Sequence, residues 1–599
     1  MNVHPVDIFI IIVYFATMLM IGFWFTRRAS KNLDSYFLGG KSLPWYVLGV
    51  SNAASMFDVS GTMWLVYLLF VYGLKSVFIP WLWPTFNQVF LMVYLAVWLR
   101  RSNVLTGAEW IRTRFGSGIG AELSYISVVI FAVVSVVSFI GYAYQGVGKF
   151  AVVFFPWDVS PHVYAIIILG ITAVYTMLGG MYSVVISDVV QFIIMCIVSV
   201  AVAVIAMTRT APDSIAAAVP PDWGNLWFGW KLNLDWTGIM NSVNNSISDD
   251  GYSLFGFFMT MVLLKGILAS MAGPAPNYDL QRVLSTKDTK SAALMSATVS
   301  FVLYIPRYLL ITGITVLAIV FFSPQLEQMG ENVDFEQILP YVIGNFIPVG
   351  LMGLLLAGLL AAFMSTFSST INSGAAYLVN DIYKAYIHKN ASRQTYFFMS
   401  CFCSILVVLA GIAFGLLTKS IHQVVNWIVA GLYGGYIAPN VLKWHWWRFN
   451  GYGYFAGMMS GIIAALAMPH LPYVGDMKPI YSFPILLVLS VLASIIGSLA
   501  THPESDDTLK KFYKQVRPWG FWKPVQEKVL AEDPNFALNR NFGRDMTNVG
   551  VGIIWQLMFT LVPIYLVIKQ FKAMTISLVL LVLLSVFLKF NWYNKLEKN

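Results

Sequence analysis

The sequence predicts an all-α polytopic membrane protein with about fifteen transmembrane helices, built on two inverted repeats of five helices that contain broken members. Composition indicates a membrane protein, because hydrophobic residues make up 58% of the 599 residues and charged residues only 11%. Soluble domains carry about 25% charged residues. Apolar stretches of about 20 residues, the length that crosses a bilayer as a helix, recur along the chain. These observations exclude a soluble globular protein.

The apolar stretches also set out the organisation of the chain. The expected spans are 6–26, 45–72, 78–99, 122–146, 163–179, 183–207, 251–272, 293–322, 343–383, 396–417, 422–443, 453–470, 480–500, 547–568 and 573–592. The expected units are an extra helix with its cytoplasmic loop at 1–44, a first repeat at 45–207, an extracellular loop at 208–250, a second repeat at 251–443, two extra helices at 444–500, a cytoplasmic connector at 501–545 and two C-terminal helices at 546–599.

The orientation in the membrane follows from the Lys and Arg residues between the spans. As far as the eleventh span, one set of alternate loops holds 16 of these residues and the opposite set holds 5. Positively charged loops stay in the cytoplasm, so we expect the N-terminus outside and the C-terminus inside. The expected location is a cell membrane, either a plasma membrane or a bacterial inner membrane. The net charge of +9 then reflects topology, and no nucleic-acid partner is expected.

Catalytic and cofactor sites are not indicated by the sequence. The seven His residues are scattered, and the three Cys residues lie in expected spans without paired spacing. No acid, base or metal constellation that would support an enzyme is visible. We therefore expect no cofactor, no obligate protein partner and no metal other than a coupling ion.

Two expected spans contain features that break a helix. The second span passes through the polar run MFDVSGT at 56–62, which places Asp58 at mid-membrane depth. The seventh carries Lys265 and ends in Gly-Pro-Ala-Pro at 273–276. Unwound backbone at this depth is tolerated only around a cavity or an ion site. The two breaks lie five helices apart, as expected for inverted five-helix repeats with binding sites at the broken members.

A run of small and hydroxylated residues interrupts the apolar ninth span. Residues 361–370 read AAFMSTFSST, and Ala362, Ser365, Thr366 and Ser369 share one helical face. Hydroxyl and carbonyl oxygens suit a hard cation, which favours a sodium site. The alternative is that the hydroxyls bond back to carbonyls of their own helix. The run alone leaves both readings open.

Three motifs resemble those of the sodium:solute symporter family, which includes sodium-coupled glucose, proline and sialic acid transporters. The first is DSYFLGGKSLPW at 34–45, the second is YTMLGGMYSVVISDVVQ at 175–191, and the third is the hydroxyl run at 361–370. A weaker similarity is NYDLQR at 277–282. The resemblance covers roughly 30–450 and implies a LeuT-like fold.

The resemblance also implies where sodium binds. The family's conserved sodium site corresponds to the carbonyls of Met56, Val59 and Ala362 with the hydroxyls of Ser365 and Thr366, if Asp-Val-Ser-Gly at 58–61 aligns with the Asp-Met-Ser-Gly of proline-type members. A second family site, present only in some members, corresponds to the acid of Asp188 and the hydroxyls of Ser365, Ser368 and Ser369. Two sodium ions per cycle are therefore allowed.

The solute is less well defined. Thr62 and Met63 stand where galactose transporters have Glu and Gln, so those sugar contacts are not retained. The remaining candidates for solute binding or coupling are polar or aromatic residues at membrane depth, namely Asp58, Ser60, Thr62, Trp64, Asn87, Gln88, Arg307 and Asn426. Asp58 either helps to bind sodium or solute, or forms an internal salt bridge with Arg307 or Lys265. We favour an internal partner for Arg307.

The sequence therefore predicts a sodium-coupled symporter that imports a small polar solute, a sugar or sugar derivative, by alternating access. Its expected partners are the solute, sodium and the lipid bilayer. The alternatives are a sodium symporter for an organic acid or amino acid, and a proton-coupled transporter with Asp58 or Asp188 as carrier. A transporter-like sensor is disfavoured because the longest cytoplasmic segment, 501–545, is too short for an output domain.

Overall fold

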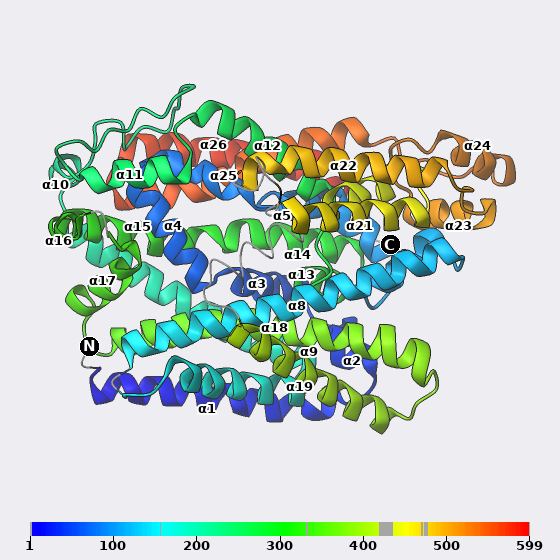
Figure 1. The fold of residues 1–599 in the computed structure, drawn as a ribbon, viewed down its shortest axis with the longest axis horizontal. Helices are drawn as coiled ribbons and strands as arrows, with labels where there is room; N and C mark the ends of the chain where they lie inside the picture. The colour runs from blue at the N-terminus through cyan, green and yellow to red at the C-terminus, as the bar shows by residue number, and fades with distance from the viewer. Residues whose placement is uncertain are drawn as a thin grey trace.

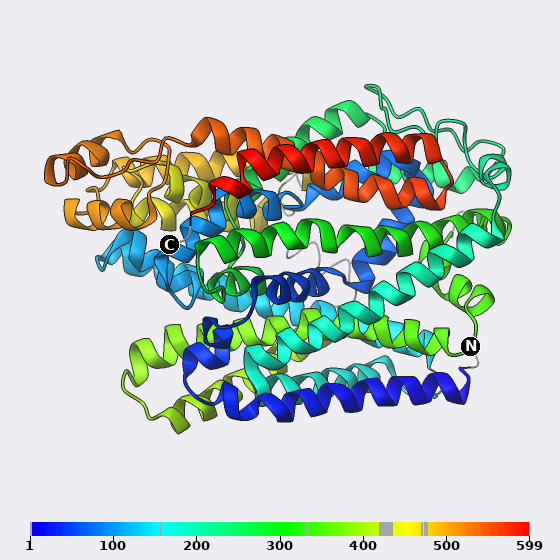
Figure 2. The same ribbon diagram turned by 180° about the vertical axis from the view of Figure 1, so that it is seen from behind.

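A computed structural model describes residues 3–155, 157–330, 333–417, 435–468, 471, 477 and 479–597. In this described part the chain is helical, and most helices run side by side along the longest axis (Figures 1 and 2). The short helices α10, α11, α16 and α17 gather at one end near the N-terminus, and α23 and α24 lie at the opposite end (Figure 1).

The first part of the chain contains α1 (Pro5–Ala29), α2 (Leu33–Leu38), α3 (Trp45–Met56), α4 (Val59–Tyr72) with its extension η2 (Gly73–Leu82), α5 (Asn87–Phe90), η3 (Leu91–Leu95), α6 (Ala96–Ser102), α7 (Gly107–Phe115), α8 (Ile119–Phe154), α9 (Pro161–Arg209), α10 (Pro212–Ala217) and α11 (Asn241–Asp250). The second part contains α12 (Phe255–Met271), α13 (Tyr278–Leu284), α14 (Thr289–Val302), α15 (Tyr304–Phe321), α16 (Ser323–Gln328), α17 (Ile338–Phe346), α18 (Leu351–Ala376) with η6 (Tyr377–Ile387), α19 (Arg393–Leu417), α21 (Gly451–Ala467), α22 (Pro479–Leu499), α23 (Asp506–Val516), α24 (Lys523–Glu532), α25 (Phe542–Val567) and α26 (Phe571–Asn591).

The described residues contain 10 helices that are long and apolar enough to cross a membrane, or up to 12 if each bent pair forms one span. The expected count of about fifteen is therefore not confirmed. Helix α21 has only 17 residues, and most of the expected span 422–443 lies outside the described residues. The limits of the two repeats, 45–207 and 251–443, likewise stay predictions.

Helix α9 contains two of the expected spans, 163–179 and 183–207. Its 49 residues would extend about 73 Å as one straight helix, against a hydrocarbon core of about 30 Å. Gly180 interrupts it with φ 52° and ψ −145°. A Cβ at this position would lie 2.6 Å from the carbonyl oxygen of Tyr36. Glycine is needed here both for the backbone conformation and for the close approach of α2.

Helix α18 forms the centre of the bundle. Every residue from Leu355 to Ala376 is buried, and the helix packs against α1, α3, α8, α9 and α19. The outer helices have the opposite character, with large apolar side chains such as Trp24 in α1 and Phe590 in α26 exposed. A hydroxyl-rich helix surrounded by apolar helices is the arrangement expected for a polar site inside a membrane.

The two longest inserts fold against the ends of the bundle. In the loop 208–250, the indole nitrogens of Trp223 and Trp236 donate to the carbonyls of Phe70 and Val71 at the end of α4, at 2.9 and 3.1 Å. The connector 501–545 forms α23 and α24, and α23 packs on α6 and α7. Hydrogen bonds from Lys510 and Lys514 hold the pKa of Glu532 at about 2.

Candidate functional site

The first expected break separates α3 from α4 at Phe57 and Asp58. Asp58 has an extended backbone and caps α4, because its Oδ2 accepts a 2.8 Å hydrogen bond from the amide of Gly61. The same oxygen accepts the hydroxyl of Tyr142 at 2.9 Å, and Oδ1 lies 3.4 Å from Nη2 of Arg307. The expected internal salt bridge is thus formed with Arg307.

The second expected break separates α12 from α13. Helix α12 ends at Met271, Gly273 adopts φ 86°, and the side chain of Asn277 caps α13. Helix α13 carries two charged residues that are almost fully buried, Asp279 and Arg282. Both breaks thus place charged side chains in the interior of the bundle.

The hydroxyl face of α18 meets the end of α3. The Thr366 Oγ1 atom donates to the carbonyl oxygen of Ser55 at 2.8 Å and lies 3.3 Å from the carbonyl oxygen of Ala362. Met56 and Val59 flank the break beside this contact, Met56 partly buried and Val59 fully buried. The structure therefore brings the C-terminal end of α3 and the hydroxyls of α18 together. The direct contact is between the carbonyl of Ser55 and the hydroxyl of Thr366.

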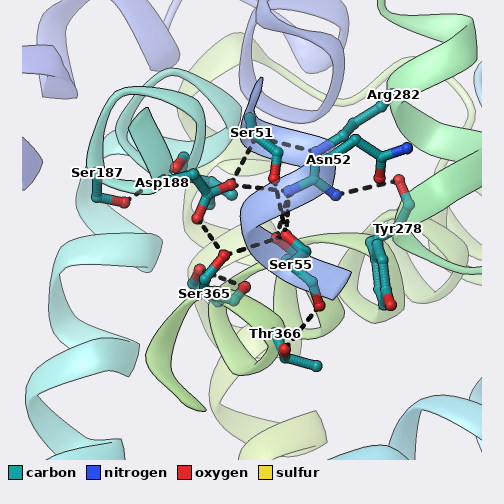
Figure 3. A network of polar contacts seen from close by, with 12 residues as sticks. Ser51, Asn52, Ser55, Ser187, Asp188, Tyr278, Arg282, Ser365 and Thr366 are labelled. Atoms are coloured by element: carbon teal, nitrogen blue, oxygen red, sulfur yellow. Dashed lines mark hydrogen bonds and ion pairs between the residues drawn. The ribbon is translucent and has the colours of Figure 1, made fainter. Parts of the chain in front are cut away.

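Asp188 of α9 lies next to the same junction (Figure 3). Its Oδ1 accepts the hydroxyl of Ser365 at 2.7 Å, and its Oδ2 accepts the hydroxyl of Ser51 at 2.6 Å. Nη2 of Arg282 lies 2.8 Å from Oδ2 and completes an ion pair in which neither side chain is more than 1% exposed. An ion pair at this depth is stable only with further hydrogen bonds to both partners.

The hydroxyls around Arg282 supply those further bonds. Nη2 also donates to Ser55 at 2.7 Å and to Ser369 at 2.6 Å, and these two hydroxyls lie 3.0 Å apart. The fourth member of the expected second sodium set, Ser368, donates to the carbonyl of Ser365 in its own helix. The guanidinium thus lies among Asp188, Ser369 and the polar face of α3.

The remaining candidates from the sequence fall into different settings. Asn87 and Gln88 at the start of α5 donate to Asp279. Thr62 donates to the carbonyl of Asp58 within its own helix, and Ser60 and Trp64 are partly buried on α4. Asn426 lies outside the described residues.

Several residues of this site were not predicted from the sequence. They are Ser51, Asn52, Ser55, Asp279 and Arg282, all buried and all hydrogen-bonded to one another or to Asp188. Two features of the sequence could have indicated them. Asp279 and Arg282 directly follow the Gly-Pro-Ala-Pro break, and Ser51 and Ser55 lie one helical turn apart before the first break. Within the described residues, no group of three or more His, Cys, Asp or Glu forms a metal site.

A model of the sodium:solute symporter family matches residues 36–461. This chain belongs to the sodium:solute symporter family. It is 23% identical over 591 residues to sodium/glucose cotransporter 4 of Danio rerio, covering 89% of this chain and 84% of that protein. It is 24% identical over 573 residues to the sodium/myo-inositol cotransporter of Mus musculus, covering 86% and 75%.

The fold agrees with a solved member of the symporters. A Na⁺-coupled sialic acid symporter in a substrate-bound outward-open state matches with a TM-score of 0.65 and 20% identity, covering 84% of this chain and 99% of that chain. The expected all-α, LeuT-like fold class is thus confirmed, without the expected count of about fifteen helices. As a member of the sodium:solute symporter family, this chain is a transporter and not an enzyme. Sodium is its coupling ion, as the family implies.

Proposed function

We propose that this symporter imports a small polar solute, a sugar or sugar derivative, together with sodium by alternating access. The observation that carries the proposal is the contact of Thr366 in α18 with the carbonyl of Ser55 at the end of α3, directly before the first break. A broken helix packed on a hydroxyl-rich helix offers oxygen ligands to a cation at membrane depth. The names of the relatives, which include glucose and myo-inositol cotransporters, support a sugar-type solute.

The proposed sodium site consists of the carbonyls of Met56, Val59 and Ala362 and the hydroxyls of Ser365 and Thr366. The hydrogen bond from Thr366 to Ser55 supports this set, because it fixes the end of α3 against α18. Ser365 also donates to Asp188, so the proposed site adjoins the buried ion pair. Sodium bound here would hold α3 and α18 in one arrangement and so favour a single conformation of the first break.

A second sodium at Asp188, Ser365, Ser368 and Ser369 would have to displace the guanidinium of Arg282. Because Arg282 already donates to Asp188 and Ser369, we propose that it supplies the positive charge and that one sodium ion moves per solute. One charge moving through 100 mV releases about 2.3 kcal/mol. With a tenfold sodium gradient, which adds about 1.4 kcal/mol, this concentrates a neutral solute several-hundredfold.

The proposed setting is a cell membrane, with the N-terminus outside and the C-terminus in the cytoplasm. The position of α10 and α11 at the end of the bundle opposite α23 and α24 supports one part of this proposal, that the loop 208–250 and the connector 501–545 lie on opposite sides of the membrane (Figure 1). The lipid bilayer is then the partner of the exposed apolar faces of α1 and α26.

Proton coupling and anionic solutes are less well supported by the geometry. Asp58 and Asp188 are each paired with an arginine, so protonation of either acid would leave a guanidinium without its counter-ion, fully buried at Arg282 and partly buried at Arg307. Arg307 is engaged by Asp58 and is not needed to bind a solute carboxylate.

A thermal-shift screen of the purified protein tests the proposed function. Sugars, sugar acids and amino acids are each added with sodium or with choline as the only cation. We expect at least one sugar to raise the unfolding temperature in sodium and not in choline, since solute and sodium strengthen each other's binding reciprocally. Stabilisation only by acids or amino acids, or equal stabilisation in choline, would contradict the proposal.

A further inference from the structure

Asp279, the second residue of α13, is surrounded by three side-chain amides. Nδ2 of Asn52 and Nε2 of Gln88 lie 2.7 and 3.0 Å from Oδ1, and Nδ2 of Asn87 lies 2.7 Å from Oδ2. We call these four residues the Asp279 cluster. All four are buried, with Asn52 fully buried and Asn87 the most exposed at 7%.

The amide oxygens of the Asp279 cluster have no hydrogen-bond partner in the described structure. Oδ1 of Asn52, Oδ1 of Asn87 and Oε1 of Gln88 are each shielded from solvent and unpaired. The carboxylate fixes their orientation, because a flipped amide would place its oxygen against a negative charge. A buried acceptor without a donor is unfavourable, so these three oxygens together offer acceptors to a ligand that brings donors.

The Asp279 cluster lies where both broken helices meet. Asn52 precedes the first break by one turn, Asp279 follows the second break directly, and Asn87 and Gln88 begin the helix after α4. Elements from both repeats therefore contribute, as expected for a solute site in this class of transporter. The neighbouring Tyr278 lies on the same helix, with its ring 5.4 Å from the guanidinium of Arg282.

The charges at the two breaks indicate the charge of the ligand. Arg307 balances Asp58 and Arg282 balances Asp188, whereas Asp279 makes no ion pair with a described residue. Asp279 is thus the acid at these breaks that has no arginine partner among the described residues, and a bound sodium would supply a balancing positive charge. An uncharged solute keeps this balance, while a cationic or anionic solute would disturb it at high cost in a low-dielectric interior.

Lys265 in α12, another buried cation, contacts a helix outside this cluster. Nζ of Lys265 in α12 lies 5.8 Å from the ring centre of Phe483 in α22, which is outside the two repeats. It packs on this outer helix and is not an ion-pair partner of Asp279.

We propose that the Asp279 cluster is a subsite for hydroxyl groups of an uncharged polyol. The hydroxyls donate to the oxygens of Asn52, Asn87 and Gln88, and Asp279 acts as a positioning residue that turns these oxygens toward the solute. The inference rests on the proposed function, since it names the recognition residues of that transport site.

Binding measurements on the purified full-length protein test this subsite. The probes are glucose and myo-inositol as neutral polyols, glucosamine as a cation and gluconate as an anion. The variants are N52A, N87A, Q88A and D279N, and the control is N548A, which removes a buried amide that pairs α25 with α26. We expect the half-saturating concentration of the neutral polyol to rise at least tenfold in the four cluster variants and to change less than twofold in N548A.

Sodium binding without solute separates this inference from the proposed function. We expect the sodium concentration that gives half of the thermal shift to stay within twofold of the wild type in N52A, N87A and Q88A. Wild-type polyol affinity in all folded cluster variants, with sodium binding intact, would overturn the subsite and leave the proposed function standing. Absence of any sodium-dependent polyol binding by the wild type would overturn both.

Deoxygenated polyols give a second test that does not depend on the folding of every variant. Removing the hydroxyl that donates to one amide oxygen should weaken binding to the wild type about tenfold and leave the matching alanine variant unaffected. Equal losses in the wild type and in every cluster variant that folds would overturn the inference. Tighter binding of glucosamine than of glucose would overturn the assignment to an uncharged solute.

Discussion

The hydroxyl of Thr366 in α18 donates a 2.8 Å hydrogen bond to the backbone carbonyl of Ser55, one residue before the end of α3. This bond joins the hydroxyl-rich helix α18 to the first broken helix, which is formed by α3 and α4. A cation held between these helices would therefore link them, and the proposed sodium coupling depends on this contact.

We predict that Thr366→Ala and Ser365→Ala each raise the sodium concentration for half-maximal uptake about tenfold. Each change removes one oxygen from the proposed sodium site, whose ligands would replace the hydration shell of the ion. Thr366→Ser keeps the hydroxyl and should stay near wild type. Thr370→Ala is the matched control, because the Thr370 hydroxyl bonds to a carbonyl of its own helix. Unchanged sodium dependence in both alanine variants would reject the site.

The buried pair of Arg282 and Asp188 should dominate stability at the centre of the bundle. Arg282→Gln leaves the Asp188 charge uncompensated, and breaking such a pair costs about 3–5 kcal/mol. The double change with Asp188→Asn should recover much of this loss. The measurement is the unfolding temperature of three purified variants, namely Arg282→Gln, Asp188→Asn and the double change. Additive losses would show that the two side chains do not depend on each other.

The charge moved per solute should be one. Arg282 already neutralises Asp188, so reconstituted vesicles at a series of voltages should give a reversal potential that corresponds to one sodium per solute. Radiolabelled sodium uptake measured beside solute uptake provides an independent ratio. A ratio of two would mean that the second ion displaces Arg282 from Asp188 and Ser369.

The pair of Arg307 and Asp58 should behave as an internal partner and not as a solute anchor. Arg307→Gln should lower the unfolding temperature, by less than the Arg282 change, because both side chains are partly exposed. Addition of Asp58→Asn should restore part of the loss. A steep rise in the half-saturation constant for an acidic solute, with stability unchanged, would assign Arg307 to the solute.

Asp7 should stabilise the start of α18. Its Oδ1 accepts the amides of Gly350 and Gly353, each at 2.7 Å, and the side chain is fully buried. Asp7→Ala should therefore destabilise the protein by about 1.5–3 kcal/mol, the usual value for a hydrogen bond to a charged group. Asp213→Ala, which removes an exposed acid from α10, should have little effect. Thermal unfolding compares the two.

The sequence predicts the fold and both breaks well, because each depends on local composition. Gly273 and its neighbouring prolines end α12, and the polar run at 56–62 interrupts an otherwise apolar helix. The division of α9 at Gly180 also follows from two apolar stretches separated by glycines. The number of spans is predicted less well, because the sequence alone does not show whether two bent segments form one span or whether a short apolar helix crosses the membrane.

The site is only partly predictable for a physical reason. Ser365, Thr366 and Ser369 lie on one predictable helix face, yet their partners come from α3, α9 and α13. Arg282 and Asp188 are 94 residues apart, and no periodicity in either segment indicates that they meet. The amide partners of Asp279 likewise come from α3 and α5, between 191 and 227 residues earlier in the chain.

Solute uptake into reconstituted vesicles under separately imposed ion gradients tests sodium coupling most directly. The solute is the sugar found in the thermal-shift screen, the pH is equal on both sides, and a protonophore is present. We predict accumulation against a concentration gradient when sodium is high outside, and loss of accumulation when potassium or choline replaces it. Undiminished accumulation after sodium is replaced would contradict the account, as would accumulation in a separate sodium-free experiment in which a proton gradient is imposed without the protonophore.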